Sequence, residues 1–130
     1  MLHLFIHRDA VADLVALRAV DGRSAARILA LLETLKDDPD LLDRLTQHEY
    51  GRGRVAEIHV SRWIEQWNKG RNLWRLKIWD LEGKGVRQRI VYAFEPTTGK
   101  HHVLGVVPRE FNYDSDHPLS RRIFAAYDDL

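Results

Sequence analysis

The middle of the chain alternates cationic and large apolar residues at every second position. The run Leu73-Trp74-Arg75-Leu76-Lys77-Ile78-Trp79 is followed by the run Arg87-Gln88-Arg89-Ile90-Val91-Tyr92-Ala93-Phe94. Successive side chains on a strand point to opposite faces, so this period predicts two half-buried strands. Paired in one sheet, the two strands would present an apolar face and a cationic face. A cationic sheet face suits a polyanion, and RNA is the polyanion that we expect.

In the first third of the chain, apolar residues recur at helical spacing. A short strand at 3–7 precedes a helix capped by Asp9, and a break at Asp21-Gly22 separates it from a second helix capped by Ser24. The second helix carries a broad leucine-rich stripe. It ends at Asp38, because a following proline disfavours helical geometry in the residue before it. Pro39 itself suits the first turn of a short third helix.

Strand patterns and a last helix fill the remainder of the chain. Strands are predicted at 55–62, 73–79, 87–94 and 101–107, with a loop at 47–54 and a glycine-containing hairpin turn at 82–85. The last helix begins near Ser115 or His117 and runs to Asp128. The order β-α-α-β-β-β-β-α predicts a single α+β domain over residues 1–130. We expect a small antiparallel sheet with the N-terminal helices packed on one face and the other face free to bind.

Composition narrows the classes of protein to which this chain can belong. Its 130 residues fit one domain that can bury a core, and it contains no cysteine. A disulfide framework and a cysteine zinc site are therefore excluded, and the composition fits a reducing, cytoplasmic environment. No apolar run is long enough to span a bilayer, and the segment 1–6 is too short for a signal peptide. We therefore expect no membrane contact.

The net charge of +1 hides a strong segregation of charge along the chain. Residues 52–109 carry twelve Lys and Arg against five Asp and Glu, whereas acidic residues outnumber basic ones by three in each of the flanking segments. The cations thus gather where the strands are predicted. This pattern argues against a protein that coats DNA with its whole surface.

The order of elements and the Arg87 run resemble the RelE/ParE superfamily of bacterial toxins from type II toxin–antitoxin pairs. The resemblance is strongest over 73–109. There a basic strand, a glycine-containing turn, an Arg-Ile-Val-Tyr strand and a strand ending Val106-Val107-Pro108-Arg109 follow in the family's order. The tail Phe111-Asn112-Tyr113-Asp114 with His117-Pro118-Leu119 looks like that of longer members. The chain exceeds the compact members around 41–54 and at its C-terminus.

The resemblance implies one of two activities. RelE-like members are ribosome-dependent endoribonucleases that cut messenger RNA in the decoding centre, without a metal or a small-molecule cofactor. ParE-like members inhibit DNA gyrase and lack the catalytic set. In both groups a cognate antitoxin wraps the toxin and holds it inactive. The density of strand cations favours cleavage of messenger RNA on the ribosome. Gyrase inhibition, and a non-toxic relative that only binds a partner, are the alternatives.

Metal-free RNA cleavage needs few protein groups, because the 2′-hydroxyl of the RNA is itself the nucleophile. The protein must move protons and stabilise negative charge on the phosphate. By position, the resemblance implies catalytic roles for Arg75 and Lys77 on the third strand, Arg89 on the fourth and Arg109 at the end of the last. It also implies a terminal general acid or base, for which Tyr113 and His117 are alternative candidates.

Each of these residues also has a purely structural interpretation. The strand cations could solvate an open sheet face. Arg109 could pair with Glu110 or Asp114, His117 could shape the turn before the last helix, and Tyr113 could be a packed aromatic.

Further contacts with RNA are expected from Arg71, Trp79, Lys84 and Arg87. Trp79 shares parity with Arg75 and Lys77, so it is the candidate for an exposed platform on which a base could stack.

The other aromatic and histidine signals suggest no cofactor site. Trp74 alternates with core residues and should be buried, whereas Trp63 and Trp67 are candidates to receive an antitoxin segment. His101 and His102 are adjacent on a strand and must point to opposite faces, so they cannot easily hold one ion. We expect neither a metal nor a cofactor.

Overall fold

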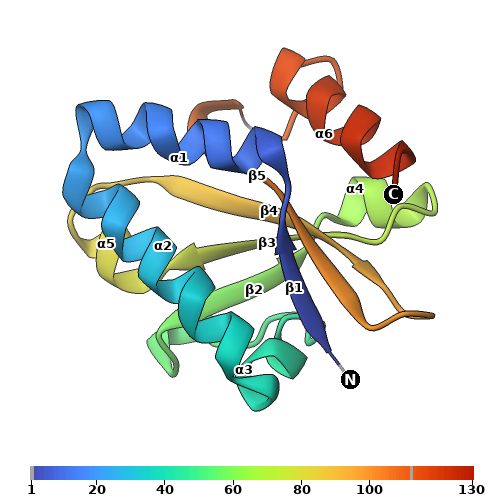
Figure 1. Ribbon diagram of the computed structural model, residues 1–130, viewed down its shortest axis with the longest axis horizontal. Coiled ribbons are helices and arrows are strands. Elements are labelled where there is room, and N and C mark those ends of the chain that lie inside the picture. The colour runs from blue at the N-terminus through green and yellow to red at the C-terminus, as the bar shows by residue number, and fades with distance from the viewer. Residues whose placement is uncertain (1, 112) are drawn as a thin grey trace.

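The computed structural model describes residues 2–111 and 113–130, and its centre is a five-stranded sheet in the order β1-β5-β4-β3-β2 (Figure 1). The strands are β1 (His3–Ile6), β2 (Ile58–Arg62), β3 (Leu73–Ile78), β4 (Gln88–Glu95) and β5 (Lys100–Pro108). Strands β2 to β5 form an antiparallel meander, as predicted. Strand β1 pairs with β5 in parallel, so the sheet is mixed. The predicted α+β class is confirmed.

Helices lie on both sides of this sheet (Figure 1). Three helices connect β1 to β2, two short ones follow β2 and β3, and one closes the chain. They are α1 (Arg8–Val20), α2 (Gly22–Asp37), α3 (Pro39–Arg44), α4 (Ile64–Asn68), α5 (Trp79–Gly83) and α6 (Pro118–Asp128), with 3₁₀ turns η1 (Arg52–Arg54) and η2 (Arg109–Phe111).

The helix starts follow the capping chemistry, although two of the predicted caps were misplaced. Helix α1 is capped by His7, whose Nδ1 accepts a hydrogen bond from the Asp9 amide at 3.0 Å. Helix α2 is capped by Asp21, whose carboxylate accepts from the Ser24 amide at 3.1 Å. In each case the acceptor lies two or three residues before the predicted cap, because a capping side chain reaches forward to the amide it satisfies.

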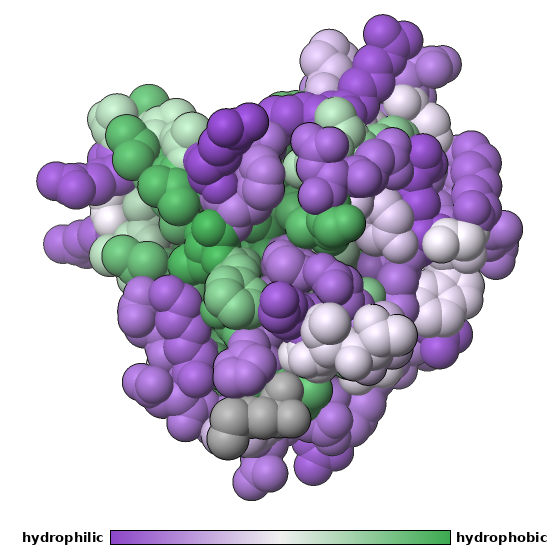
Figure 2. Space-filling view, turned by 45° about the vertical axis from the view of Figure 1, so that its right-hand side comes forward, coloured by the Kyte–Doolittle hydropathy of each residue, from purple (hydrophilic) through white to green (hydrophobic). Residues whose placement is uncertain are grey.

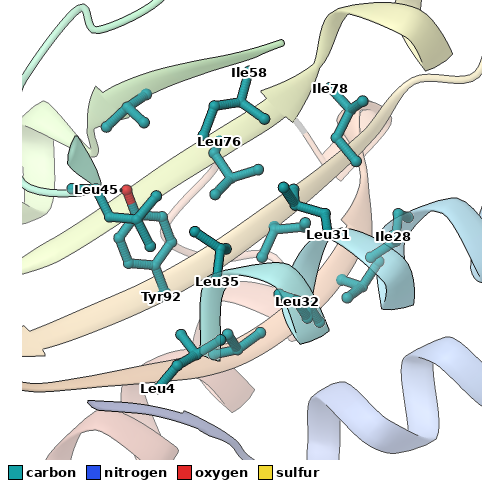
Figure 3. Packing of buried hydrophobic residues seen from close by; sticks show 14 of the residues in the cluster. Leu4, Ile28, Leu31, Leu32, Leu35, Leu45, Ile58, Leu76, Ile78 and Tyr92 are labelled. Carbon is teal, nitrogen blue, oxygen red and sulfur yellow. Dashed lines mark hydrogen bonds between the residues drawn. The ribbon is translucent and has the colours of Figure 1, made fainter. Parts of the chain in front are cut away.

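The main core lies between α2, α3 and the sheet (Figure 3). Ile28, Leu31, Leu32 and Leu35 on one stripe of α2 are all at most 2% exposed and meet Leu76, Ile78 and other apolar side chains of the strands. The buried Tyr92 hydroxyl donates a hydrogen bond to the Leu45 carbonyl at 2.6 Å and so joins β4 to the end of α3. The N-terminal helices therefore pack on one face of the sheet, as expected.

The opposite face, which we expected to be free to bind, is open only in part. Helix α6 and turn η2 cover part of it and form a second apolar cluster with the strands. This cluster consists of Trp63, Leu73, Val91, Ala93, Leu104, Val107, Phe111, Ile123 and Ala126. Trp63 is 2% exposed and stands edge-on to Phe111, so it is not available to receive a partner segment. Trp74 is buried, as predicted, and Trp67 packs against it at 5.5 Å between ring centroids.

Strand β3 is shorter than the alternation suggested, because Trp79 begins α5 instead of ending the strand. Asp80 and Glu82 lie in the first turn of α5, where carboxylates favour a helix start. The glycine-containing turn to β4 comes only after this helix. Strand β2 likewise begins at Ile58, and the predicted strand residue Val55 is 84% exposed.

The loop before β2 lies along the outer edge of that strand. The Glu49 amide donates to the Val60 carbonyl at 2.9 Å, and the Val60 amide donates to the Tyr50 carbonyl at 2.9 Å. Gly51 has a φ of 78°, and a Cβ added there would lie 1.7 Å from the Ile58 carbonyl oxygen. Only glycine fits this close approach of two backbones. The segment predicted as a loop is a loop, and its backbone hydrogen bonds hold it against the edge of β2.

Part of the surface is apolar. Figure 2 shows hydrophobic side chains gathered on one part of a face that is otherwise hydrophilic. Exposed large apolar side chains occur on β1, α1 and α2, among them Phe5 at 47%, Val15 at 63% and Leu29 at 45%. Within residues 2–111 and 113–130, every helix falls short of the length and apolar character that crossing a membrane requires.

Candidate functional site

A cationic hollow of about 260 Å³ opens on the part of the sheet that α6 leaves uncovered. It is lined by residues from β2, β3, β4 and the segment after β5. They are His59, Ser61, Arg75, Leu76, Lys77, Arg89, Arg109 and Tyr113. Five of the six residues to which the resemblance assigned catalytic roles are in this list. We call this site the cationic hollow.

Strand register explains why the β2 and β3 side chains meet. Arg75 lies opposite Ser61, and Lys77 lies opposite His59. Leu76, between the two cations, packs with the main core on the other face. Arg75 and Lys77 thus share one face, as their parity predicts.

Arg89 forms the buried wall of the hollow. It lies on β4 opposite Val107 and is 8% exposed. Its guanidinium pairs with the Glu82 carboxylate and donates to the Gln88 carbonyl at 3.1 Å. Arg89 is therefore held in place, and Glu82 is the acidic group that balances part of the charge.

Arg75 and Arg109 are the cations available to a ligand. Among the residues that the structure describes, neither takes part in an ion pair, so the pairing of Arg109 with Glu110 or Asp114 that sequence allowed is not observed. Guanidinium groups bind phosphate oxygens in a bidentate manner. The hollow thus offers two unpaired guanidinium groups beside a third that is fixed.

Tyr113 lies under Arg75 in a strained backbone conformation. Its φ is 55°, a left-handed value that residues other than glycine rarely adopt, and the Arg75 guanidinium carbon lies 4.3 Å from the centre of its ring. Within the described part of the chain, its buried hydroxyl has no hydrogen-bond partner. Burial raises the pKa of Tyr113, although Arg75, Arg89 and Arg109 act in the opposite direction. The hydroxyl is therefore a proton donor at neutral pH.

Among the cations of the hollow, Lys77 has a lowered pKa. Burial, followed by the charges of Arg89, Arg109 and Arg75, lowers the pKa of Lys77, and Glu82 opposes this shift. Its Nζ also lies 4.5 Å from the centre of the Trp79 ring. An ammonium group among like charges releases a proton more readily than a free lysine does.

His59 and Ser61 are members of the hollow that our sequence reasoning missed. The signal was present in the sequence, because the apolar Ile58 and Val60 occupy every second position of the predicted strand. The alternation then places His59 and Ser61 on the same face as Arg75 and Lys77.

The remaining predicted site residues lie outside the lining of the hollow. Arg71 donates to the Gln66 side chain at 2.7 Å and lies over the Phe124 ring, while Lys84 pairs with Asp80 at 3.8 Å. Arg87 is exposed just before β4 begins.

His117 has the structural role that sequence left open. Its Nδ1 accepts a hydrogen bond from the Leu119 amide at 3.1 Å and so caps α6. Asn112, part of the tail that suggested the resemblance, lies outside the described residues.

Trp79 is not an open stacking platform, contrary to our expectation. One side of its indole is stacked on His59, with ring centroids 5.5 Å apart and planes 6° apart. Arg54 and Lys77 also lie against the ring, and its Nε1 donates to the Gly51 carbonyl at 2.8 Å. Trp79 therefore supports the wall of the hollow, with one face of its ring already covered by His59.

Comparison with known proteins gives no independent guide to this site, since neither a scan against protein-family models nor a search of the curated proteins finds a match.

Proposed function

We propose that this chain is a RelE-like toxin, a metal-independent endoribonuclease that cuts messenger RNA on the ribosome. The observation that carries the proposal is the convergence of Arg75, Lys77, Arg89 and Arg109 with Tyr113 around one hollow. The resemblance of 73–109 to the RelE/ParE superfamily implies the same activity. A gyrase inhibitor would have no need for proton-transfer groups among these cations.

The chemistry of the hollow suits cleavage by the RNA's own 2′-hydroxyl. The guanidinium groups of Arg75 and Arg109 are free to bind the scissile phosphate and stabilise the extra negative charge of the transition state. Arg89, fixed by Glu82, adds charge from the wall. The Tyr113 hydroxyl lies among the three arginines and can protonate the leaving 5′-oxygen, because they stabilise the phenolate that remains.

A cognate antitoxin is the proposed partner that holds the toxin inactive. Such a partner would meet the hollow with acidic side chains and the apolar surface with apolar ones. The exposed Phe5, Val11 and Val15 offer apolar surface to such a partner. An adjacent short open reading frame whose product binds this chain would support the proposal.

The test is primer extension on messenger RNA after brief induction, with and without ribosome stalling. We expect breaks only in translated messages from the wild type, and none from Arg89→Ala. Removing this arginine leaves Glu82 without its partner, so Arg75→Met is the second variant; it removes an unpaired guanidinium and should also abolish cutting. Arg121→Ala, which removes an exposed cation of α6, is the matched control and should cut normally.

Three results would contradict the proposal. Cleavage and toxicity that survive Arg89→Ala would refute the assigned roles. Failure of DNA supercoiling with translation intact would point to gyrase inhibition, and absence of growth arrest would point to a non-toxic binding protein.

A further inference from the structure

A histidine that the proposed function does not use lies in the wall of the cationic hollow. His59 is on β2 opposite Lys77, and its side chain is 15% exposed. Its ring lies flat on Trp79, whose indole is itself anchored to the Gly51 carbonyl. The plane of the imidazole is therefore fixed by stacking, and the ring is kept at the edge of the hollow.

A carboxylate faces one nitrogen of this ring. Glu49 Oε1 lies 3.5 Å from His59 Nε2, a buried atom without a hydrogen-bond partner among the described residues. Glu49 has a φ of 68°, a left-handed conformation that costs free energy in any residue except glycine. Backbone hydrogen bonds between the 49–50 segment and Val60 hold it there. Strained backbone is thus found at two positions beside the same hollow, Glu49 and Tyr113.

Burial, more than the neighbouring charges, favours a neutral imidazole at His59 at physiological pH. Burial is the largest effect and lowers the pKa of His59, with Lys77 and Arg52 acting in the same direction. Glu49 opposes this shift. Two other polar groups lie nearby. His48 Nε2 lies 3.8 Å from Glu49 Oε1, and the Arg54 guanidinium lies over the ring of Trp79. A neutral imidazole with one nitrogen turned to a carboxylate can accept a proton on the other, Nδ1.

We propose that His59, oriented by Glu49 and Trp79, is the general base of the RNA cleavage, and this inference rests on the proposed function. Nδ1 takes the proton of the 2′-hydroxyl, the 2′-oxygen forms a bond to phosphorus, and the bond from phosphorus to the 5′-oxygen breaks. The 5′-oxygen takes the proton of Tyr113. The products are a 2′,3′-cyclic phosphate and a 5′-hydroxyl; His59 then releases its proton to water and Tyr113 regains one.

The experiment compares His59→Asn with His102→Asn in single-turnover cleavage of ribosome-bound message between pH 5.5 and 9. His102 is the matched control, because it also lies beside a carboxylate, with Nε2 at 2.6 Å from Glu95, but outside the hollow. We expect the wild-type rate to rise with pH as His59 loses its proton. The cleavage rate of His59→Asn should be lower by about 100-fold or more, and it should no longer depend on pH, because that is the typical effect of removing a general base. His102→Asn should cleave at the wild-type rate.

Two further variants separate catalysis from structure. Glu49→Gln removes the charge that raises the pKa of His59, so the acid limb of the profile should move to lower pH. In His59→Ala, added imidazole should restore cutting, because a free base can enter the space that the side chain leaves.

The outcomes separate this inference from the function on which it rests. A wild type that never cuts message on translating ribosomes would overturn the proposed function itself. A wild type that cuts, with His59→Asn at the same rate and with the same pH dependence, would overturn only the role of His59. Should His59→Asn fail to fold, an unshifted acid limb in Glu49→Gln would decide against the proposal.

Discussion

The Glu82 carboxylate accepts a hydrogen bond from the Arg89 guanidinium, and this pair joins α5 to β4 behind the cationic hollow. Both side chains are largely buried. The pair fixes one cation of the hollow and also supplies the negative charge that reaches Lys77. The charge of the hollow is therefore adjusted from behind, by a residue that does not line it.

Replacing Glu82 by Gln tests this relationship. Gln can still accept a hydrogen bond from Arg89, so the fold should persist with a loss of about 1–2 kcal/mol in unfolding free energy. Because Glu82 raises the pKa of Lys77, its removal should lower that pKa further. NMR titration of the lysine ammonium group measures the shift. An unchanged or higher Lys77 pKa would show that the two side chains do not interact in solution.

Tyr113→Phe should separate activity from stability. The hydroxyl has no hydrogen-bond partner in the described structure, so its removal should leave the unfolding free energy unchanged while cleavage falls by about 100-fold. Tyr127→Phe is the matched control: its hydroxyl accepts a hydrogen bond from the Asn72 amide at 3.0 Å, so stability should fall by about 1–3 kcal/mol and activity should remain. Denaturant titration and the cleavage assay together distinguish the two. The reverse pattern would exclude Tyr113 as the acid.

Stability should fall in mild acid because of His101. This side chain is fully buried, lies 4.5 Å from Phe94 between ring centroids, and neither of its nitrogens has a hydrogen-bond partner among the described residues. Burial lowers the pKa of His101 from 6.5 to about 4. The unfolded chain therefore binds the proton more readily, so stability is complete above pH 6.5 and decreases as the pH falls towards 4.

His101→Leu should remove most of this acid sensitivity. A shift of that size corresponds to a loss of about 3 kcal/mol by pH 4. Urea unfolding of the wild type and of His101→Leu at pH 7.5 and 4.5 measures this loss of stability. Equal losses in the two would show that other groups cause the acid effect.

Gly51→Ala should displace the 48–51 segment from β2. The new Cβ would overlap the Ile58 carbonyl, and the Trp79 hydrogen bond to the Gly51 carbonyl would be lost with it. We expect a loss of more than about 1 kcal/mol. Hydrogen exchange at the Val60 amide should accelerate, since that amide donates to the displaced segment. Gly53→Ala, at a similar φ but with open space around it, is the comparison that isolates the overlap from backbone strain. Equal effects of the two variants would show that overlap with the Ile58 carbonyl is not the cause of the destabilisation.

Local patterns were sufficient to predict the fold class and the sharing of a face by Arg75 and Lys77, because side-chain direction on a strand depends only on parity. The same rule applied to β2 would have found His59. The parallel pairing of β1 with β5 was beyond local reasoning, because it depends on contacts between residues about a hundred positions apart.

Trp79 shows where parity fails. It follows the alternation of β3, yet its hydrogen bond to Gly51 and its stacking on His59 place it at the start of a helix. Gly51 lies in a segment that the sequence marks only as a polar loop, and His59 lies on the neighbouring strand β2. Tertiary contacts of this kind override a strand pattern at its last position.

The 48–50 segment also governs how this protein can associate with others. Sheets commonly recruit a foreign strand, or a second copy of themselves, through unused amides and carbonyls along an outer strand. At Val60 those groups are already engaged by the protein's own chain, as is the Arg62 amide, which donates to His48 Nδ1 at 3.0 Å. Fibril-like growth from β2 is thereby opposed, and a protein that binds on this side must cover the sheet instead of lengthening it.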